Sequence, residues 1–432
     1  MAVPGSAVLE AVLGRIWASP RIVEDFHALC DCGGRFAGTA SEARAQVFLA
    51  ERLSTIAPAR RESVPYRGWT RGPAGVALPD GQTLTAHALV RSVATPQAGL
   101  TAPLVDLGRG TPADIARAGE TVRGAIVLVR HEFMLGRDHV HRRRKYDAAR
   151  AAGAAGFLIA AHLPGVGPVT GSSGDGGAGH IPCAGIGFEE AARLAALDGQ
   201  PVTLHVGGVF ADAQATNLLA AIPGTGADLV VLSAHIDGHD LAESAIDNAS
   251  GLACALAAAE ALADVVPSLP RGIEIGLVTI EEWALAGSEA HLATMPATER
   301  ARRVLNVNLD SVAGDDALTA LTSGVPGMDA FLRTALAPAG LSVGLHPGFM
   351  GNSDHANYLR AGIPAFRLCA GFERADSALS LLLTRADTRD KVLPHQLKTA
   401  ASVTAAILLA ACSGADLPPR LDAATVARLT AG

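Results

Sequence analysis

Cysteines, aromatic residues and long apolar runs are all scarce in this chain of 432 residues. Six cysteines are scattered along it, and only Cys30 and Cys32 are close, at a spacing too isolated for a zinc knuckle. We therefore expect reduced, mostly buried thiols. No run approaches the roughly 20 apolar residues of a membrane span, and the first residues lack the pattern of a secretory signal. These absences predict a cytoplasmic protein with no membrane partner.

Basic charge is also in short supply. The formal net charge is −7, and the only dense basic run is Arg142–Lys145, beside His139 and His141. A protein that follows a phosphate backbone needs a broad basic surface, so nucleic acid is excluded as a partner. We interpret the basic run as a charged loop leading into a helix. Hydrophobic residues, at 49%, are abundant enough for a large core, and the length predicts two or three domains of roughly 150 residues each.

The pattern of apolar residues divides the chain into one domain and a second domain inserted within it. Helical spacing at Ala7–Ile16 and Ser41–Ile56 is followed, over residues 85–209, by short β-branched runs separated by glycine, proline and aspartate. Beyond Thr216, apolar runs of strand length alternate with helical segments. This alternation predicts an α/β fold, a mostly parallel mixed sheet sandwiched by helices. We expect residues 1–84 and 210–432 to form that domain, with a mostly β domain inserted between them.

Three predicted strands of the α/β domain end in acidic or imidazole side chains. These strands are Leu229–Ala234, Ile273–Ile280 and Val304–Leu309. The polar residues that follow them are His235, Asp237, Asp247, Glu281, Glu282 and Asp310. Ligands bind at the carboxyl ends of such strands, and buried carboxylates this dense cost free energy unless a cation neutralises them. Mixed nitrogen and oxygen donors suit zinc, as one ion or as two ions bridged by a carboxylate.

The order and spacing of these residues resemble the co-catalytic dizinc exopeptidase family, of the aminopeptidase and plasma glutamate carboxypeptidase type. The resemblance extends to Gly34–Thr39, to Asp237–Leu241, and to Ser353–His355 followed by Gly362-Ile363-Pro364. The inserted domain, with Ala148–Gly156, resembles the protease-associated (PA) domain that these peptidases carry. The resemblance thus implies a zinc exopeptidase-like fold with an inserted PA domain.

The same resemblance implies a role for each residue at the strand ends. It implies four metal ligands: His235, Asp247, Glu282 and Asp310. Glu281 would be the general base, and Asp237 would orient His235 from behind. We expect four substrate contacts: Asp354, His355, His239 and Arg367. The resemblance implies a peptide or small amide as substrate, and a homodimer as the assembly. His291, on the helix after Glu282, is expected to face solvent.

One position departs from the family's pattern. Members close the second metal site with the histidine of a His-Thr-x-x-Asp-Thr signature, and the chain has Leu383 at that place, with Asp387 and Thr388 retained. Leucine cannot bind zinc, so the second site lacks its nitrogen ligand, and the sequence is compatible with one zinc ion or two. In one interpretation His355 supplies the missing ligand and the protein is an ordinary exopeptidase. In others it is a one-metal enzyme with divergent amide, ester or condensation chemistry in small-molecule metabolism, or a non-catalytic binding scaffold. Metal-dependent hydrolysis of peptide or other amide bonds is the main prediction.

Overall fold

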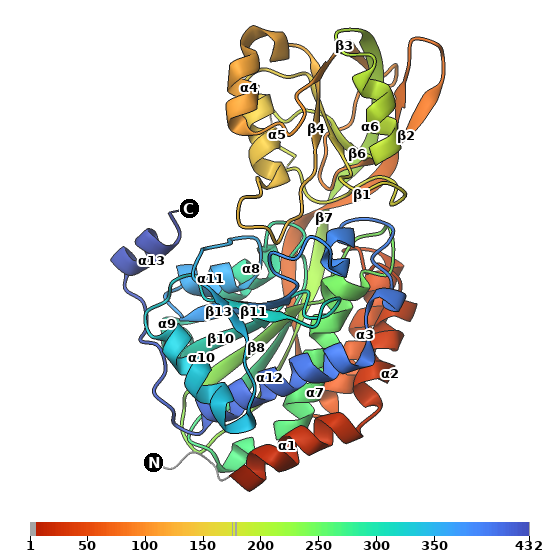
Figure 1. The fold of residues 1–432 in the computed structure, drawn as a ribbon. Helices are drawn as coiled ribbons and strands as arrows, with labels where there is room; N and C mark the ends of the chain where they lie inside the picture. The colour runs from red at the N-terminus through yellow and green to blue at the C-terminus, as the bar shows by residue number, and fades with distance from the viewer. Residues whose placement is uncertain (1–5, 175, 178, 432) are drawn as a thin grey trace.

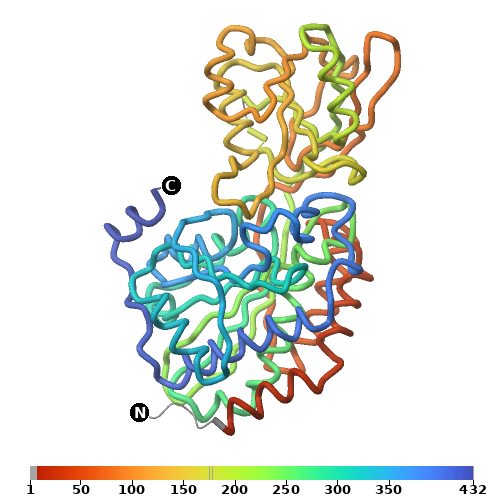
Figure 2. The backbone as a smooth tube through the Cα atoms, viewed as in Figure 1, coloured from red at the N-terminus to blue at the C-terminus, as the bar shows by residue number. Residues whose placement is uncertain are grey.

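A computed structural model of the chain describes residues 6–174, 176–177 and 179–431, arranged as two stacked bodies (Figure 1). Two long strands, β1 (Ala59–Ala77) and β7 (Pro201–Ile222), run through both bodies and pair antiparallel along most of their length. They form the neck between the lower and the upper body (Figure 2). Because the bodies share these continuous strands, the expected domain boundaries at 84/85 and 209/210 stay predictions.

The lower body is built on a mixed sheet in which β1 pairs with β7 and the order continues β7-β9-β8-β10-β13-β11-β12. The other strands are β8 (Leu229–His235), β9 (Gly272–Val278), β10 (Arg303–Leu309), β11 (Leu318–Leu321), β12 (Gly344–His346) and β13 (Ala365–Ala370). Strands β9, β8, β10 and β13 are parallel, whereas β7 runs antiparallel to β9 and β11 runs antiparallel to β13. The carboxyl ends of the four parallel strands therefore meet at one edge, and the three strands predicted from the sequence are confirmed.

Helices cover both faces of this sheet. On one face four helices pack together: α1 (Ser6–Ala18), α2 (Arg21–Asp31), α7 (Gly251–Leu262) and α12 (Pro394–Cys412). On the other lie α8 (Ala286–Thr294), α9 (Ala297–Ala301) and α11 (His355–Arg360). The remaining helices of the lower body are α3 (Ala40–Ser54), α10 (Met328–Leu336) and α13 (Ala423–Leu429). Among the helices of the described residues, none has the length and hydropathy needed to cross a membrane.

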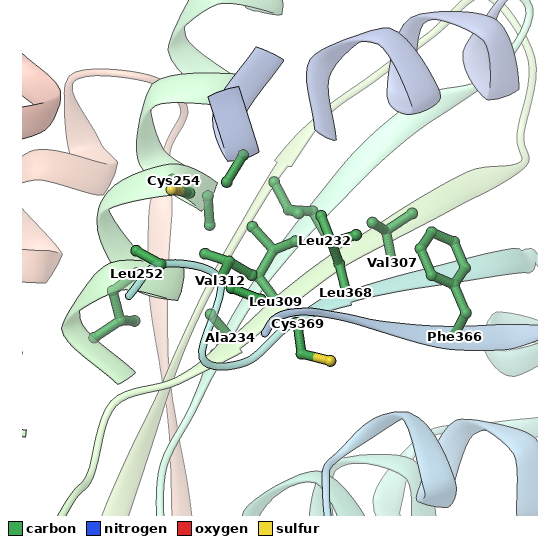
Figure 3. Packing of buried hydrophobic residues seen from close by; sticks show 14 of the residues in the cluster. Leu232, Ala234, Leu252, Cys254, Val307, Leu309, Val312, Phe366, Leu368 and Cys369 are labelled. Atoms are coloured by element: carbon green, nitrogen blue, oxygen red, sulfur yellow. The ribbon is translucent and has the colours of Figure 1, made fainter. Parts of the chain in front are cut away.

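The core lies between the sheet and α7. Helix α7 is apolar nearly all round, as expected for a helix buried on most sides. Leu232, Val307 and Leu368 project from β8, β10 and β13 toward Leu252 and Cys254 of α7 (Figure 3). Burying each large aliphatic side chain contributes about 1.5–3 kcal/mol, so the strands whose ends carry the polar residues are held firmly. All six cysteines are free and buried, as predicted.

The upper body is mostly β, as predicted for the insertion. Its other strands are β2 (Thr83–Ala88), β3 (Leu100–Asp106), β4 (Ile126–Arg130), β5 (Gly156–Ala160) and β6 (Cys183–Ile186). They follow the order β1-β2-β6-β5-β4-β3-β7, and pairing of Ala74–Ala77 of β1 with Thr203–Val206 of β7 closes this sheet on itself. Helices α4 (Pro112–Ala118), α5 (Arg142–Ala151) and α6 (Phe188–Ala195) lie outside it.

Candidate metal centre

Three of the strand-end residues converge at the carboxyl edge of the lower sheet. His235 is the last residue of β8, Glu281 follows β9 and Asp310 follows β10, and one ligand atom from each lies within 4.8 Å of the others. Asp247 joins them from η2 (Ala245–Ser250), the irregular turn before α7. His235 Nε2 lies 3.0 Å from Asp247 Oδ1 and 3.7 Å from Asp310 Oδ1. The predicted meeting of these strand-end residues is thus confirmed, and their roles as metal ligands and base stay predictions.

The backbone around His235 sets which ring nitrogen faces the carboxylates. His235 Nδ1 lies 2.9 Å from the backbone oxygen of Asp237. A carbonyl oxygen only accepts, so Nδ1 donates to it, and Nε2 is the nitrogen that faces Asp247 and Asp310. The Asp237 carboxylate, 3.9 Å from Nδ1, instead accepts the backbone N–H groups of Glu281 and Glu282. Asp237 therefore acts on His235 through its carbonyl, and its carboxylate positions the glutamate pair.

The electrostatics of this cluster favour binding of a cation. Burial raises the pKa of Glu281 well above its ordinary value, and the charges of Glu282 and Asp310 act in the same direction. Burial also raises the pKa of Asp237, to about 8. Asp247 Oδ1 and Glu282 Oε1 are both buried, and each faces an imidazole nitrogen, His235 Nε2 at 3.0 Å and His239 Nε2 at 2.7 Å. A buried donor set of one imidazole and several carboxylates fits a divalent cation such as zinc.

Arg367 and Ser353 stabilise Asp310 as an anion. Arg367 Nη2 lies 3.1 Å from Asp310 Oδ1, and the Ser353 hydroxyl donates to Asp310 Oδ2. Burial raises the pKa of Asp310, but Arg367 and His235 outweigh it and lower the pKa overall. Arg367 was expected to contact substrate. Although it lines the cavity described below, its guanidinium is held in this buried ion pair.

Asp354 and His355, also expected to contact substrate, lie behind Asp310. Both are fully buried at the start of α11, and the Ser288 hydroxyl donates to Asp354 Oδ1. Burial raises the pKa of Asp354 to about 6 and lowers that of His355 to about 3. Among the residues that the structure describes as lining the cavity, neither is present. They lie inside the lower body, because α11 is buried from His355 to Leu359.

A cavity of about 780 Å³ lies over the cluster, with walls from both bodies. The lower body contributes Asp247, Glu281, Glu282, Asp310 and Leu383, among others. The upper body contributes four arginines, which we name the arginine rim: Arg137, Arg142, Arg143 and Arg144. The sequence interpretation missed this placement. Its only signal was the dense basic run, which has the same pattern as a solvated loop.

Of the rim residues, Arg142 is the one that is buried and interacts electrostatically with the metal centre. It is buried at the start of α5, its Nε donates to the backbone oxygen of Ser172 at 3.0 Å, and its charge acts on Glu282, Glu281 and Asp247. A Cβ on Gly171 would lie 2.1 Å from Arg142 Cζ, so only glycine fits there. The upper body thus places the positive charge of the Arg142 guanidinium near the carboxylates of the metal centre.

The segment that carries the altered signature still supports Asp247. Leu383 is buried and lines the cavity, where it offers no ligand atom. Asp387, four residues on, accepts the backbone N–H groups of Ile246 at 2.7 Å and Asp247 at 3.3 Å. Burial raises the pKa of Asp387 to about 7. The structure assigns Asp387 a positioning role that the sequence interpretation did not.

Two parts of the chain match known families. Residues 217–408 match "Peptidase family M28", and residues 100–194 match "PA domain". Aminopeptidase YwaD of Bacillus subtilis is 26% identical over 391 residues, which span 87% of this chain and 81% of that protein. The probable lipoprotein aminopeptidase LpqL of Mycobacterium tuberculosis is 28% identical over 329 residues, 70% of this chain but only 63% of LpqL.

Solved structures share the fold. A zinc aminopeptidase of Bacillus subtilis, BSAP, superposes with a TM-score of 0.73 at 23% identity, covering 93% of this chain and 97% of that one. A peptidase M28 precursor of Shewanella amazonensis gives a TM-score of 0.79 at 22% identity, covering 96% and 98%. These likenesses confirm the predicted α/β sandwich with an inserted PA domain.

Proposed function

Because this chain belongs to peptidase family M28 and carries an inserted PA domain, we propose that it is a zinc-dependent aminopeptidase that acts on short peptides. The observation that carries the proposal is the buried convergence of His235, Glu281 and Asp310, with Asp247 Oδ1 3.0 Å from His235 Nε2. A binding scaffold has no physical need for such a cluster, which is costly without a cation. Neither the scaffold nor a divergent one-metal chemistry is favoured by the relatives.

The geometry assigns each group a task in peptide hydrolysis. His235 Nε2 and the carboxylates of Asp247 and Asp310 are the groups that would hold zinc. When bound, zinc lowers the pKa of water toward about 7 and offers positive charge to the substrate's carbonyl oxygen. The Glu281 carboxylate takes a proton from the attacking water and returns it to the leaving amine nitrogen.

The arginine rim suggests which peptides enter the cavity. Its four arginines line the cavity, and the other charged residues described there are the carboxylates of the metal centre, Asp147, Arg360 and Arg367. Guanidinium groups bind carboxylates in paired hydrogen bonds. A short peptide with its amino end at the metal centre can therefore place its terminal carboxylate against the rim.

Chelation tests the proposed reaction. We expect removal of metal with a chelator to abolish hydrolysis of di- and tripeptides with free amino ends, and added zinc to restore it, because no other group of the centre can supply the electrophile. Release of amino acids, measured by amine derivatisation and chromatography, is the readout. The same peptides with an acetylated amino end serve as the control and should resist cleavage. Equal cleavage of blocked and free peptides, or full activity in protein shown to be metal-free, would contradict the proposal.

Arg142→Met tests the role of the rim. We expect KM for dipeptides with a free carboxyl end to rise about tenfold, the equivalent of about 1.4 kcal/mol, with little change for the same dipeptides as carboxamides. Arg142→Lys keeps the charge and should recover part of the loss. The matched control is Arg150→Met, on the same helix but outside the cavity lining. An equal rise in KM for acids and amides would show that Arg142 only maintains structure.

A further inference from the structure

Strands β1 and β7, which form the neck between the two bodies, break their regular pairing at one point. The pairing is continuous up to Arg71 of β1 and resumes, with its register shifted, at Ala74. Gly72 and Pro73 thus face Gly207 of β7 alone, which is a β-bulge, and a bulge bends and twists the strands that carry it. A Cβ on Gly72 would lie 2.7 Å from the carbonyl carbon of Gly207, so glycine is needed for this close approach. Beyond the bulge the two strands belong to the closed upper sheet.

Arg71, directly before this bulge, joins the two bodies. Its Nε and Nη2 each lie 2.8 Å from an oxygen of the Asp240 carboxylate, in the loop that follows β8 of the lower body. Its Nη1 donates to the backbone oxygen of Ala88, in β2 of the upper body. His87, also in β2, has its Nε2 3.4 Å from Asp240 Oδ1. We name Arg71, Asp240 and His87 the neck clamp.

The neck clamp is shielded from water and paired in charge. The Arg71 side chain is 10% exposed, and its guanidinium carbon lies 5.0 and 5.1 Å from the ring centroids of Phe36 and Trp69. Burial raises the pKa of Asp240, but His87 and Arg71 outweigh it and lower the pKa overall. A guanidinium that binds a carboxylate at two points fixes orientation as well as distance. The clamp therefore restrains how the strands bend at the bulge.

The lower-body partners of Arg71 belong to segments that carry the metal centre. Asp240 lies in the loop that begins at His235. Phe36 packs on Trp283, with 4.8 Å between ring centroids, and Trp283 directly follows the glutamate pair of the centre. Beyond the bulge, the upper body carries the arginine rim. The clamp thus connects the segments of the metal centre to the body that holds the rim.

Elsewhere the bodies meet through backbone groups and exposed side chains. The Thr170 N–H donates to the carbonyl oxygen of Leu383, and the Glu373 N–H to that of Leu135, each at 2.9 Å. Arg137 and Glu373 form an ion pair at 2.8 Å, but their side chains are 63% and 42% exposed, and exposed pairs contribute little to stability. These contacts can part when the bulge bends. The more deeply buried, two-point ion pair of the clamp is therefore the contact to remove in a test.

We propose that Arg71 and Asp240 are positioning residues of the peptide reaction, because their ion pair holds the bulge at the angle that places the arginine rim over the metal centre. This inference rests on the proposed function, since it concerns how the rim reaches the substrate. Neither residue belongs to the cavity lining that the structure describes, so each acts through the placement of the rim. When the pair is broken, the bulge becomes a hinge and the rim moves away from the carboxylate of the substrate.

A distance measurement between the bodies is the first test. Nitroxide labels at Ala116→Cys on α4 and Thr298→Cys on α9, both exposed positions, report the separation of the bodies by pulsed electron paramagnetic resonance; the six native cysteines are buried. We expect one narrow distance with the clamp intact and a broader, shifted distribution in Asp240→Ala. Asp240→Glu keeps a carboxylate and should recover the narrow distance. The matched control is Asp106→Ala, which removes a two-point ion pair with Arg130 inside the upper body, at 2.7 and 2.9 Å, and should leave the distance unchanged.

Kinetics are the second test and separate positioning from a merely structural role. In Asp240→Ala, KM for dipeptides with a free carboxyl end should rise roughly tenfold, as in Arg142→Met. The zinc content, kcat and KM for the matching carboxamides should stay unchanged. Because both substitutions withdraw the same guanidinium from the substrate, the double variant Arg142→Met/Asp240→Ala should raise KM no further than Arg142→Met alone. Multiplication of the two effects would show that Asp240 acts independently of the rim.

The outcomes separate this inference from the proposed function. Circular dichroism and a thermal melt establish that each variant is folded. An unchanged distance distribution in folded Asp240→Ala, an equal rise in KM for acids and carboxamides, or loss of zinc from this variant would each overturn the positioning role and leave the aminopeptidase standing. Conversely, a distance that broadens in Asp240→Ala and narrows again in Asp240→Glu, in a protein that cleaves no peptide, would uphold the clamp as the restraint between the bodies and overturn the reaction.

Discussion

Glu281→Gln should lower kcat for peptide hydrolysis by about 10²–10⁴-fold, the usual contribution of a general base. Glutamine keeps the size and polarity of the side chain. The hydrogen bond to the Asp237 carboxylate is unaffected, because the backbone N–H of residue 281 donates it. Only the ability to take and return a proton is lost. Steady-state kinetics on a free dipeptide, with zinc content measured on the same sample, checks this expectation.

Zinc content decides between two roles for Glu281. If it is the base, the variant keeps the metal of the wild type; loss of an ion together with activity would make it a ligand. Glu289→Gln, an exposed glutamate of α8, is the matched control and should retain full activity. Equal kcat for wild type and Glu281→Gln across a broad panel of aminoacyl and dipeptide substrates would contradict metal-dependent hydrolysis with this base.

Arg35→Met should reduce the free energy of unfolding by about 3–5 kcal/mol, the range for leaving buried polar groups unpaired. Arg35 is fully buried, and its guanidinium donates to the backbone oxygens of Ile236, Glu243 and Ser244, among others. These oxygens belong to the loop between His235 and Asp247. Removing the guanidinium leaves them buried without donors, so we also expect weaker zinc binding.

Denaturant unfolding curves and zinc titrations measure the two effects of Arg35→Met. Arg44→Met is the matched control, because exposed Arg44 makes a hydrogen bond to the oxygen of Cys32 and touches no part of the loop. It should change stability by no more than about 0.5 kcal/mol. Arg35→Lys keeps the charge but loses the planar fork, and should fall between the two. An unfolding midpoint for Arg35→Met equal to that of Arg44→Met would refute the structural role.

The strand-end residues were predictable because the signal for them is local. An apolar run of strand length followed at once by a polar residue, as in Leu229–Ala234 before His235, places that residue at the edge of a sheet. Parallel strands share that edge, so His235, Glu281 and Asp310 had to meet. The same local rule made Leu383 visible as a departure from the family's pattern.

Partners far apart in the chain gave no such signal. His291 was expected to face solvent, but it is 2% exposed and its Nδ1 lies 2.9 Å from Glu62 Oε2 on β1. Its position on α8 is a local feature, whereas its burial depends on a strand more than two hundred residues away. For the same reason the basic run at Arg142 had the pattern of a surface loop, and nothing in the spacing indicated that His239 lies buried 2.7 Å from Glu282 Oε1.

The sequence by itself determined the order of strands and helices, the set of strand-end donors and the family, because each depends on spacing along the chain. Only the tertiary structure decided how closely these donors approach one another, and that Arg142 of the upper body lines the same cavity as they do. Continuous pairing of β1 with β7 holds the two bodies together, and Gly34 packs on the backbone of His239 in the loop between His235 and Asp247. Such contacts join distant segments, and their energies depend on shape and burial, which spacing does not encode.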